Sequence, residues 1–229
     1  MRDILLRPRK RLIKIVPNSK NREIFLLFFG PTLMLMSYLL HLLLPPQFAV
    51  QVIFVTLIGV VVLLLGLVKL VEPRFSYYLC PQGLIYRHRC GQWQISWLEI
   101  SRIGQLQTYV SNQYTDLPYI GLKLHDLESV ARNISPRLAN KLIHEQNELL
   151  LLAVGNNEIK SEDAVINFEP YHLNGIEYKG PIAGWLYKTE QLFKAYGYHI
   201  YLPENSFDRE VSEFMRLLKQ CQHFVKMNS

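Results

Sequence analysis

The fold of this chain is decided by IFLLFFGPTLMLMSYLLHLLL at residues 24–44 and FAVQVIFVTLIGVVVLLLGLVKLV at 48–71. The short segment PPQ at 45–47 separates these two apolar runs. The first run contains no Lys, Arg, Asp or Glu, and the second contains only Lys69. A helix of about 20 apolar residues crosses the ~30 Å hydrocarbon layer of a bilayer. Pro45 and Pro46 disfavour a continuous helix, which predicts a tight turn between the runs. We therefore predict a transmembrane helical hairpin over residues 24–71.

Basic residues around the hairpin predict its orientation. Eight Lys or Arg residues precede the first run, Lys69 and Arg74 lie at the end of the second, and the connecting turn has none. Cytoplasmic flanks of membrane helices carry an excess of Lys and Arg. We therefore expect both termini in the cytoplasm and the turn on the opposite side of the membrane.

The charge of the chain is concentrated near this hairpin. The formal net charge is +6, but residues 1–74 hold ten Lys/Arg against three acids, whereas the remainder holds fifteen against sixteen. The part after the hairpin therefore has a net charge of −1 and lacks the basic excess of a polyanion-binding domain. We do not expect nucleic acid as a partner.

The basic arm at residues 1–23 precedes the first apolar run and includes the segment RPRKRLIKIV at 7–16. Three interpretations of this segment remain open. Its charges can signal topology alone, or they can adsorb to anionic lipid headgroups, at about 1 kcal/mol per basic residue. The segment can also form a strand that pairs with the domain after the hairpin. Under the headgroup interpretation the contacting residues are Arg9, Lys10, Arg11 and Lys14.

Polar and small residues inside the hairpin favour an anchor over a conduit. His41 is the ionisable side chain at depth, near the outer end of its helix, where it can reach water or headgroups and can pair with Ser37 one turn earlier. An interfacial or packing role for His41 competes with a proton-relay or ligand role. Gly30-Pro31, Gly59 and Gly66 predict a kink and close helix packing.

Residues 74–229 predict one α+β domain. Phe75–Cys80 and Leu84–Arg89 flank the turn residues Pro81-Gln82-Gly83, and Trp93, Ile95 and Trp97 give a third strand with one apolar face. We next predict a polar loop at 111–116, a strand at 118–124, a helix from the cap Ser135 and Pro136 to about 147, and a buried strand at 149–154. After these we predict a hairpin at Asn174-Gly175, a helix at 181–195 stopped by Gly197, a strand at 198–202, and a last helix capped by Asp208.

The last predicted helix has an apolar stripe at spacings of three, four and seven residues, formed by Val211, Phe214, Met215, Leu218, Cys221 and Val225. The stripe predicts that the helix packs along one face on the sheet. The predicted architecture is thus mainly antiparallel and closed by a C-terminal amphipathic helix.

The order of these elements carries a family resemblance. Residues 77–104, YYLCPQGLIYRHRCGQWQISWLEISRIG, include Trp97 and Ile100 as a W-x-x-I edge, and LPYIGLKL (117–124), ISPRLANKL (134–142) and GYHIYLPENSFDREVSEFMRLL (197–218) follow. The chain resembles an uncharacterised bacterial inner-membrane family with two transmembrane helices followed by a PH-like domain. The resemblance implies a bent sheet or barrel with inserted helices at 134–147 and 158–195 and a capping helix at the C-terminus. It also implies a location in the bacterial inner membrane.

Catalytic and metal-binding motifs are absent from the sequence. Cys80, Cys90 and Cys221 have no CxxC spacing and suggest reduced thiols, while His88 and Cys90 share a strand side without a second ligand pair. We therefore predict no metal, no cofactor and a binding or scaffold role. The alternative is a membrane-associated enzyme acting on a lipid or envelope precursor, in a cleft beside the insertions.

Aromatic and basic residues of the first strands give the best candidate surface. Tyr77, Tyr78, Tyr86, Trp93 and Trp97 are typical of a small core, or alternatively of a rim that dips into headgroups or holds a partner. Arg87 and Arg89 alternate and are expected on one face. Such a pair is usually a solvated face, and it is also our best candidate for contact with anionic headgroups or another membrane protein.

Overall fold

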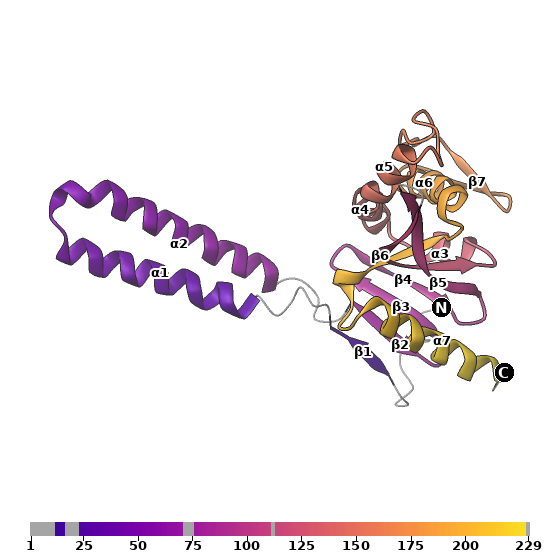
Figure 1. Ribbon diagram of the computed structural model, residues 1–229, viewed down its shortest axis with the longest axis horizontal. Helices are drawn as coiled ribbons and strands as arrows, with labels where there is room; N and C mark the ends of the chain where they lie inside the picture. Colours follow the sequence, from indigo (N-terminus) through magenta and orange to yellow (C-terminus); the bar gives the residue numbers. More distant parts are fainter. Residues whose placement is uncertain (1–11, 17–22, 71–75, 111–112, 228–229) are drawn as a thin grey trace. The chain divides into compact units, whose positions relative to one another are not determined.

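The computed structural model describes residues 12–16, 23–70, 76–110 and 113–227. The chain divides into two compact units (Figure 1). Residues 17–74 form one, which we call the helical unit, and residues 1–16 together with 75–229 form the other, the mixed unit. The mixed unit therefore begins before the helical unit in the sequence.

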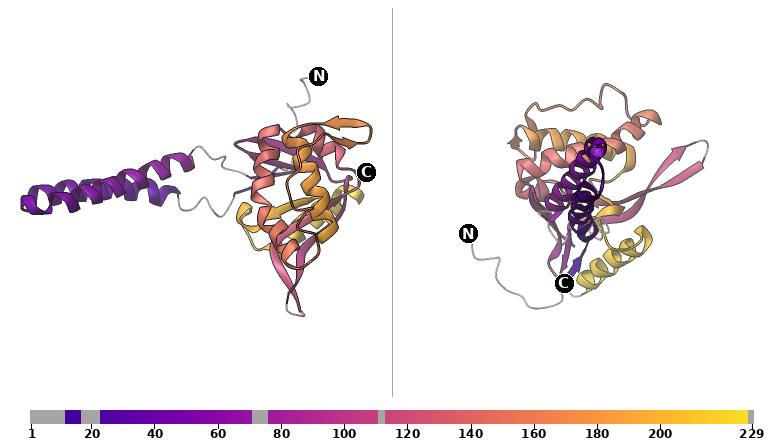
Figure 2. Two further views of the ribbon diagram at one scale, coloured as in Figure 1. Left: turned by 90° about the horizontal axis from the view of Figure 1, so that it is seen from above. Right: turned by 90° about the vertical axis from the view of Figure 1, so that its left-hand side faces the viewer.

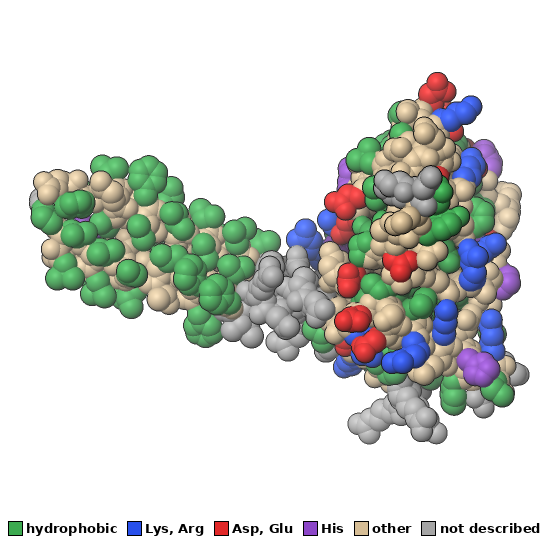
Figure 3. Space-filling model, in the orientation of Figure 1, with side chains coloured by type: hydrophobic (Ala, Val, Ile, Leu, Met, Phe, Trp, Pro, Cys, Tyr) green, Lys and Arg blue, Asp and Glu red, His purple; other side chains and the backbone are tan. Residues whose placement is uncertain are grey.

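The helical unit is the predicted hairpin. Helices α1 (Glu23–Leu43) and α2 (Ala49–Leu70) are joined through the short 3-10 turn η2 (Pro46–Phe48). The segments Phe25–Leu43 and Ala49–Val68 are long and apolar enough to span a membrane. Apolar side chains are spread over the visible surface of the pair (Figure 3), and only 11% and 17% of the two segments are buried. A core helix would instead have most of its residues buried.

Small residues let the two helices approach closely, as predicted. A Cβ atom at Gly30 would lie 2.8 Å from the backbone nitrogen of Leu63, and one at Gly59 would lie 2.8 Å from Cγ of Met34. Ser37 Oγ lies 2.7 Å from Thr56 Oγ1 and donates to Val52 O at 2.9 Å. Ser37 thus hydrogen-bonds to α2 across the close approach of the two helices.

The mixed unit contains three antiparallel sheets among its described residues. The first has the order β1-β2-β3-β4, the second β5-β6-β9, and the third pairs β7 with β8. The strands are β1 (Ile13–Ile15), β2 (Tyr77–Cys80), β3 (Gly83–His88), β4 (Gly91–Ser96), β5 (Ile100–Val110), β6 (Gln113–Leu124), β7 (Tyr171–Leu173), β8 (Ile176–Tyr178) and β9 (Ile200–Pro203).

Strand β1 resolves one of the open interpretations of the N-terminal arm. Ile15 pairs with Tyr77 in an antiparallel register, and the Ile15 side chain is fully buried. Residues 13–15 thus form a strand that pairs with the domain. It follows that the helical unit is an insertion between two adjacent strands, β1 and β2.

Among the described residues, five α-helices and the short 3-10 turn η3 (Glu204–Ser206) complete the mixed unit. The α-helices are α3 (Glu128–Asn133), α4 (Pro136–Glu145), α5 (Asn147–Gly155), α6 (Pro181–Tyr196) and α7 (Val211–Met227). Two predicted helix boundaries are confirmed. Ser135 caps α4 by accepting a hydrogen bond from Leu138 N at 3.2 Å, and Gly197 ends α6 in the left-handed conformation with φ of 74°.

The predicted buried strand at 149–154 is wrong, because these residues form α5. Leu149, Leu150 and Ala153 are buried, whereas Leu151 and Leu152 are exposed. This is a helical spacing, which a short, continuous apolar run does not reveal in the sequence.

Two further predictions need correction. The polar loop at 111–116 is mostly strand, because residues 113–116 pair with β5 and extend the β5–β6 hairpin outward from the rest of the unit (Figure 2). Asp208 does not cap the last helix, which begins at Val211. Instead it accepts a hydrogen bond from Arg209 Nε at 2.8 Å.

The main core lies between the first two sheets and helices α3, α4, α6 and α7. Tyr77, Tyr86, Trp93 and Trp97 are buried there and Tyr78 is half-buried, which confirms core packing for four of the five aromatics. The described strands do not close into the predicted barrel. Helix α3 packs against β4, which is the last strand in the order of the first sheet.

Candidate functional site

One end of the first sheet carries both connections to the helical unit. The chain leaves β1 after Val16 and returns just before Ser76, and the pairing of Ile15 with Tyr77 makes these positions neighbours. The register continues through Tyr77↔Tyr86 and Tyr86↔Trp93, so the β3–β4 turn lies at the same end. We call this end, formed by Val16, Ser76 and residues 87–92, the linked end.

Arg87 and Arg89 lie at the linked end. Arg87 is near the end of β3, opposite Gln92, and its backbone N–H donates to Ser76 O at 2.9 Å, while Arg89 lies in the following turn. Both side chains are exposed. Among the residues that the structure describes, neither arginine has a carboxylate partner.

A third arginine joins this turn through the tertiary fold. Ser135 Oγ donates to Cys90 O at 2.7 Å and so fixes the first turn of α4 against the β3–β4 turn. Arg137 lies in that first turn and is exposed. Sequence reasoning missed Arg137 because 45 residues separate Ser135 from Cys90 and no motif links them.

The basic arm contributes one described residue. Lys14 lies on β1 opposite Tyr78. Arg9, Lys10 and Arg11 lie outside the described residues.

The aromatic layer beneath the linked end is inert in acid–base terms. The Tyr86 ring lies 5.1 Å from that of Tyr77 and 5.3 Å from that of Trp93. Burial raises the pKa of both tyrosines well above their ordinary value. Both therefore remain neutral over the physiological pH range.

His88 and Cys90 close the β3–β4 turn. His88 Nδ1 accepts a hydrogen bond from the Cys90 backbone N–H at 3.2 Å. Within the described ranges, no group of three or more His, Cys, Asp or Glu side chains is placed to hold a metal ion. The hydrogen bond between His88 and Cys90 gives the pair a local structural role in the turn.

A second candidate site is a pocket of about 230 Å³ beside α6, which we call the Lys188 pocket. Lys188 is only 3% exposed, and its Nζ donates to Ile143 O at 2.5 Å and to Asn147 Oδ1 at 3.5 Å. Burial lowers the pKa of Lys188 to about 8. Glu162 and Asp163 are exposed and also line the pocket.

The Lys188 ammonium group has a structural role at the junction of α4 and α5. Its bond to Ile143 O satisfies a carbonyl in the last turn of α4, where a cation also complements the helix dipole. A pKa near 8 leaves part of the population as free amine at neutral pH, which is the nucleophilic form. Sequence reasoning missed Lys188 because it lies within an amphipathic helix that has no catalytic motif.

Comparisons with known proteins give one match. No curated protein and no solved structure is significantly similar to the chain. A family described as a protein of unknown function (DUF2982) matches residues 77–224, which run from the first residue of β2 into the last turn of α7. This match covers more than half of the sequence, and the chain therefore belongs to the DUF2982 family.

Proposed function

We propose that this protein is a membrane-anchored binding or scaffold module whose linked end contacts anionic lipid headgroups. The observation that carries the proposal is the grouping of Arg87, Arg89 and Arg137 around one turn, without carboxylate partners among the described residues. In this account α1 and α2 span the bacterial inner membrane and the mixed unit lies in the cytoplasm. The excess of Lys and Arg on both flanks of the hairpin supports that orientation.

Chain connectivity supports contact between the linked end and the headgroups. The connecting segments 17–22 and 71–75 each reach at most about 20 Å, at 3.3–3.6 Å per residue. Two short tethers at neighbouring positions give the linked end a high effective concentration near the bilayer surface. Each basic side chain close to an anionic surface contributes about 1 kcal/mol.

The proposal includes a PH-like character for the mixed unit. Two antiparallel sheets share one core, and the C-terminal helix α7 packs against β5 and β6 of the second sheet. In such an arrangement the loops at one end of the sheets are free to bind a ligand, and here that end carries the arginines.

Photo-crosslinking tests the headgroup contact. We would reconstitute the full chain into nanodiscs that contain phosphatidylcholine with a photoactivatable phosphatidylglycerol. Crosslinks should concentrate in the peptides around residues 84–93 and 134–141 and should decrease with added salt. The triple variant Arg87→Gln, Arg89→Gln, Arg137→Gln should lower the crosslinking yield at least about threefold, because most of the local positive charge is removed.

A matched variant controls for net charge. Arg216→Gln, Lys219→Gln, Lys226→Gln removes the same charge from the exposed face of α7 and should keep the wild-type crosslinking pattern. Equal yields from both triple variants, or a neutral lipid probe that crosslinks equally well, would reject headgroup recognition at the linked end.

The Lys188 pocket supports a second candidate function, catalysis on a lipid or envelope precursor. A buried amine with a pKa near 8 beside a pocket of about 230 Å³ is the specific observation in its favour. At pH 7.5 an amine-selective acylating probe should label Lys188 before the exposed Lys160 and Lys194. Labelling of Lys188 no faster than of these two lysines would contradict a nucleophilic role.

A further inference from the structure

We infer that Arg102, Lys123 and His199 form a binding site for a phosphate group on the second sheet. This site is separate from the linked end. Strand β5 begins at Ile100, next to the sheet end where Trp97 Nε1 donates to Cys80 O at 2.7 Å, and this is the end opposite to the linked end. The inference rests on the contacts of these three side chains and is independent of the headgroup proposal.

Strand register brings the three basic side chains together. Arg102 and Lys123 are direct partners in the β5–β6 ladder, so their Cβ atoms lie about 5 Å apart on one face. His199 is the next neighbour, since its backbone N–H donates to Leu122 O at 2.9 Å. Like charges that lie directly opposite each other destabilise a sheet, unless an anion compensates them.

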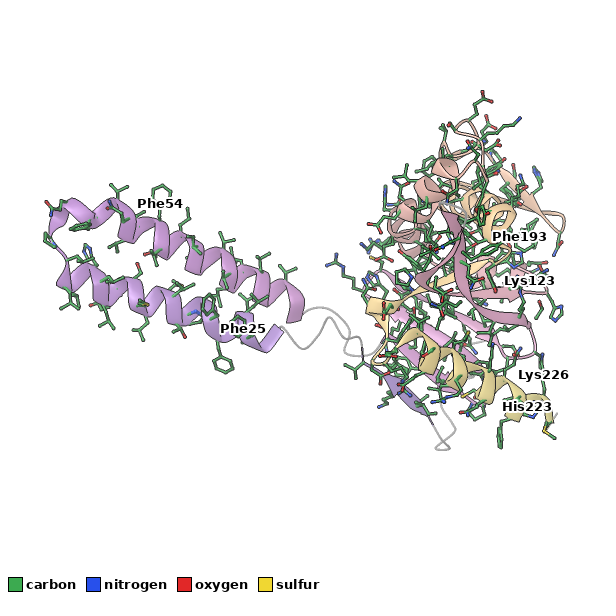
Figure 4. The ribbon with its side chains drawn as sticks, in the orientation of Figure 1. Phe25, Phe54, Lys123, Phe193, His223 and Lys226 are labelled. Carbon is green, nitrogen blue, oxygen red and sulfur yellow. The ribbon has the colours of Figure 1, made fainter. Side chains whose placement is uncertain are left out.

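Aromatic rings hold the two cations in place. The Arg102 guanidinium carbon lies 4.6 Å from the centre of the Tyr198 ring, and Lys123 Nζ lies 5.5 Å from the centre of the Phe193 ring. Figure 4 shows Lys123 next to Phe193 on this flank. Side chains held in this way lose less conformational entropy when they bind a ligand.

His199 supplies a third hydrogen-bond donor. Its ring stacks on Phe193 with centroids 4.4 Å apart and planes within 6°. Its Nδ1 accepts a hydrogen bond from Leu124 N at 3.0 Å, which in the neutral ring leaves the proton on Nε2. Guanidinium, ammonium and imidazole donors side by side match the several acceptor oxygens of a phosphate group.

Carboxylates do not neutralise this cluster within the described part of the chain. No ion pair involves Arg102 or Lys123. Glu99 accepts a hydrogen bond from Ser96 N, and Asp126 accepts one from Asn174 Nδ2. Lys and Arg side chains gather along the flank where Lys123 lies (Figures 3 and 4).

A purely structural role explains only part of this arrangement. Arg102 Nη2 donates to Gly197 O at 3.5 Å and so complements the C-terminal end of α6. Lys123 Nζ and His199 Nε2 have no such bond to the helix end among the described residues. Those two groups remain available for a phosphate group.

Pyrophosphate binding tests the site in the full chain. In nanodiscs of neutral lipid, titration followed by ³¹P NMR should give saturable binding in the millimolar range or tighter, weakened by salt. Lys123→Gln and Arg102→Gln should each weaken binding about tenfold. Two controls should bind like the wild type, namely Lys194→Gln, which removes an ion-paired lysine from α6, and the linked-end variant Arg87→Gln, Arg89→Gln, Arg137→Gln.

The outcomes separate the sources of phosphate. Binding of pyrophosphate that Lys123→Gln weakens supports a soluble phosphorylated ligand. A site that ignores pyrophosphate but crosslinks phosphatidylglycerol through Lys123 also supports phosphate recognition, with lipid as the source. Binding that survives both substitutions, or no saturable binding of either probe by the wild type, overturns the inference. Melting temperatures identify a variant that lost binding through unfolding, and Lys123→Arg, which keeps the charge, should retain binding.

Discussion

The buried amine of Lys188 makes stability depend on pH in a specific way. Burial lowers its pKa from the ordinary 10.5 to about 8, so the unfolded chain binds more protons than the folded chain between these pH values. The contribution of Lys188 to the free energy of unfolding should therefore rise from pH 8 to 10.5. We expect the wild type to gain stability relative to Lys188→Met over this range, measured by urea unfolding. A stability difference that does not change with pH would contradict this prediction.

Gly121 gives a residue-scale test of packing. A Cβ atom at this position would overlap the buried ring of Tyr198, so Gly121→Ala should lower the free energy of unfolding by roughly 1–3 kcal/mol. Gly155→Ala is the matched control, because a Cβ there meets no atom within 4 Å, and it should be neutral or slightly stabilising. Equal effects of the two variants would disprove the close contact with Tyr198.

Local signals predict single residues well only when their partners are local. The cap at Ser135 and the left-handed Gly197 could be identified from neighbouring residues alone. Arg137 and the pair Arg102–Lys123 could not, because their significance depends on strand register and on a hydrogen bond to Cys90.

Strand β1 places a segment that precedes the helical unit within the fold of the mixed unit. Ile15 is fully buried against the first sheet, so Ile15→Ala should destabilise the mixed unit by about 2–4 kcal/mol. Ile13 lies on the same strand but is 40% exposed, and Ile13→Ala should cost less than about 1 kcal/mol. Hydrogen exchange of the β2 amides reports the loss. If the β2 amides are equally protected from exchange in both variants, β1 is not part of the folded domain.

The elements also show which patterns predict structure reliably. Long apolar runs and alternating strands were predicted correctly, since their periodicity is strong over many residues. The run at 149–154 was predicted wrongly because six apolar residues fit a helix or a strand equally well, and only its packing on α6 distinguishes them.

At the scale of the whole molecule, the split of the net charge shows where basic residues are concentrated along the sequence but not how they are arranged in space. The sequence places most of the excess charge beside the apolar runs. The fold adds three arginines at the linked end and a separate basic row on the second sheet, although the net charge after residue 74 is −1.

Topology is a prediction at this same scale. A reporter fused after residue 229 should be active only in the cytoplasm, because Lys and Arg flank both ends of the hairpin and are absent from its turn. Replacing the eight basic residues before Ile24 by Gln should lower the fraction of correctly oriented chains. Periplasmic activity of the unmodified fusion would reverse the orientation.

The most direct test of the central claim compares the distance of the two ends of the first sheet from the bilayer. A fluorophore placed at Gln92→Cys reports on the linked end and one at Gln82→Cys on the opposite turn, both exposed positions, with the native cysteines replaced by Ser. In anionic nanodiscs with spin-labelled headgroups, we predict strong quenching at position 92 and weak quenching at 82, with the difference reduced by salt. Equal quenching at both positions, or stronger quenching at 82, would contradict this prediction.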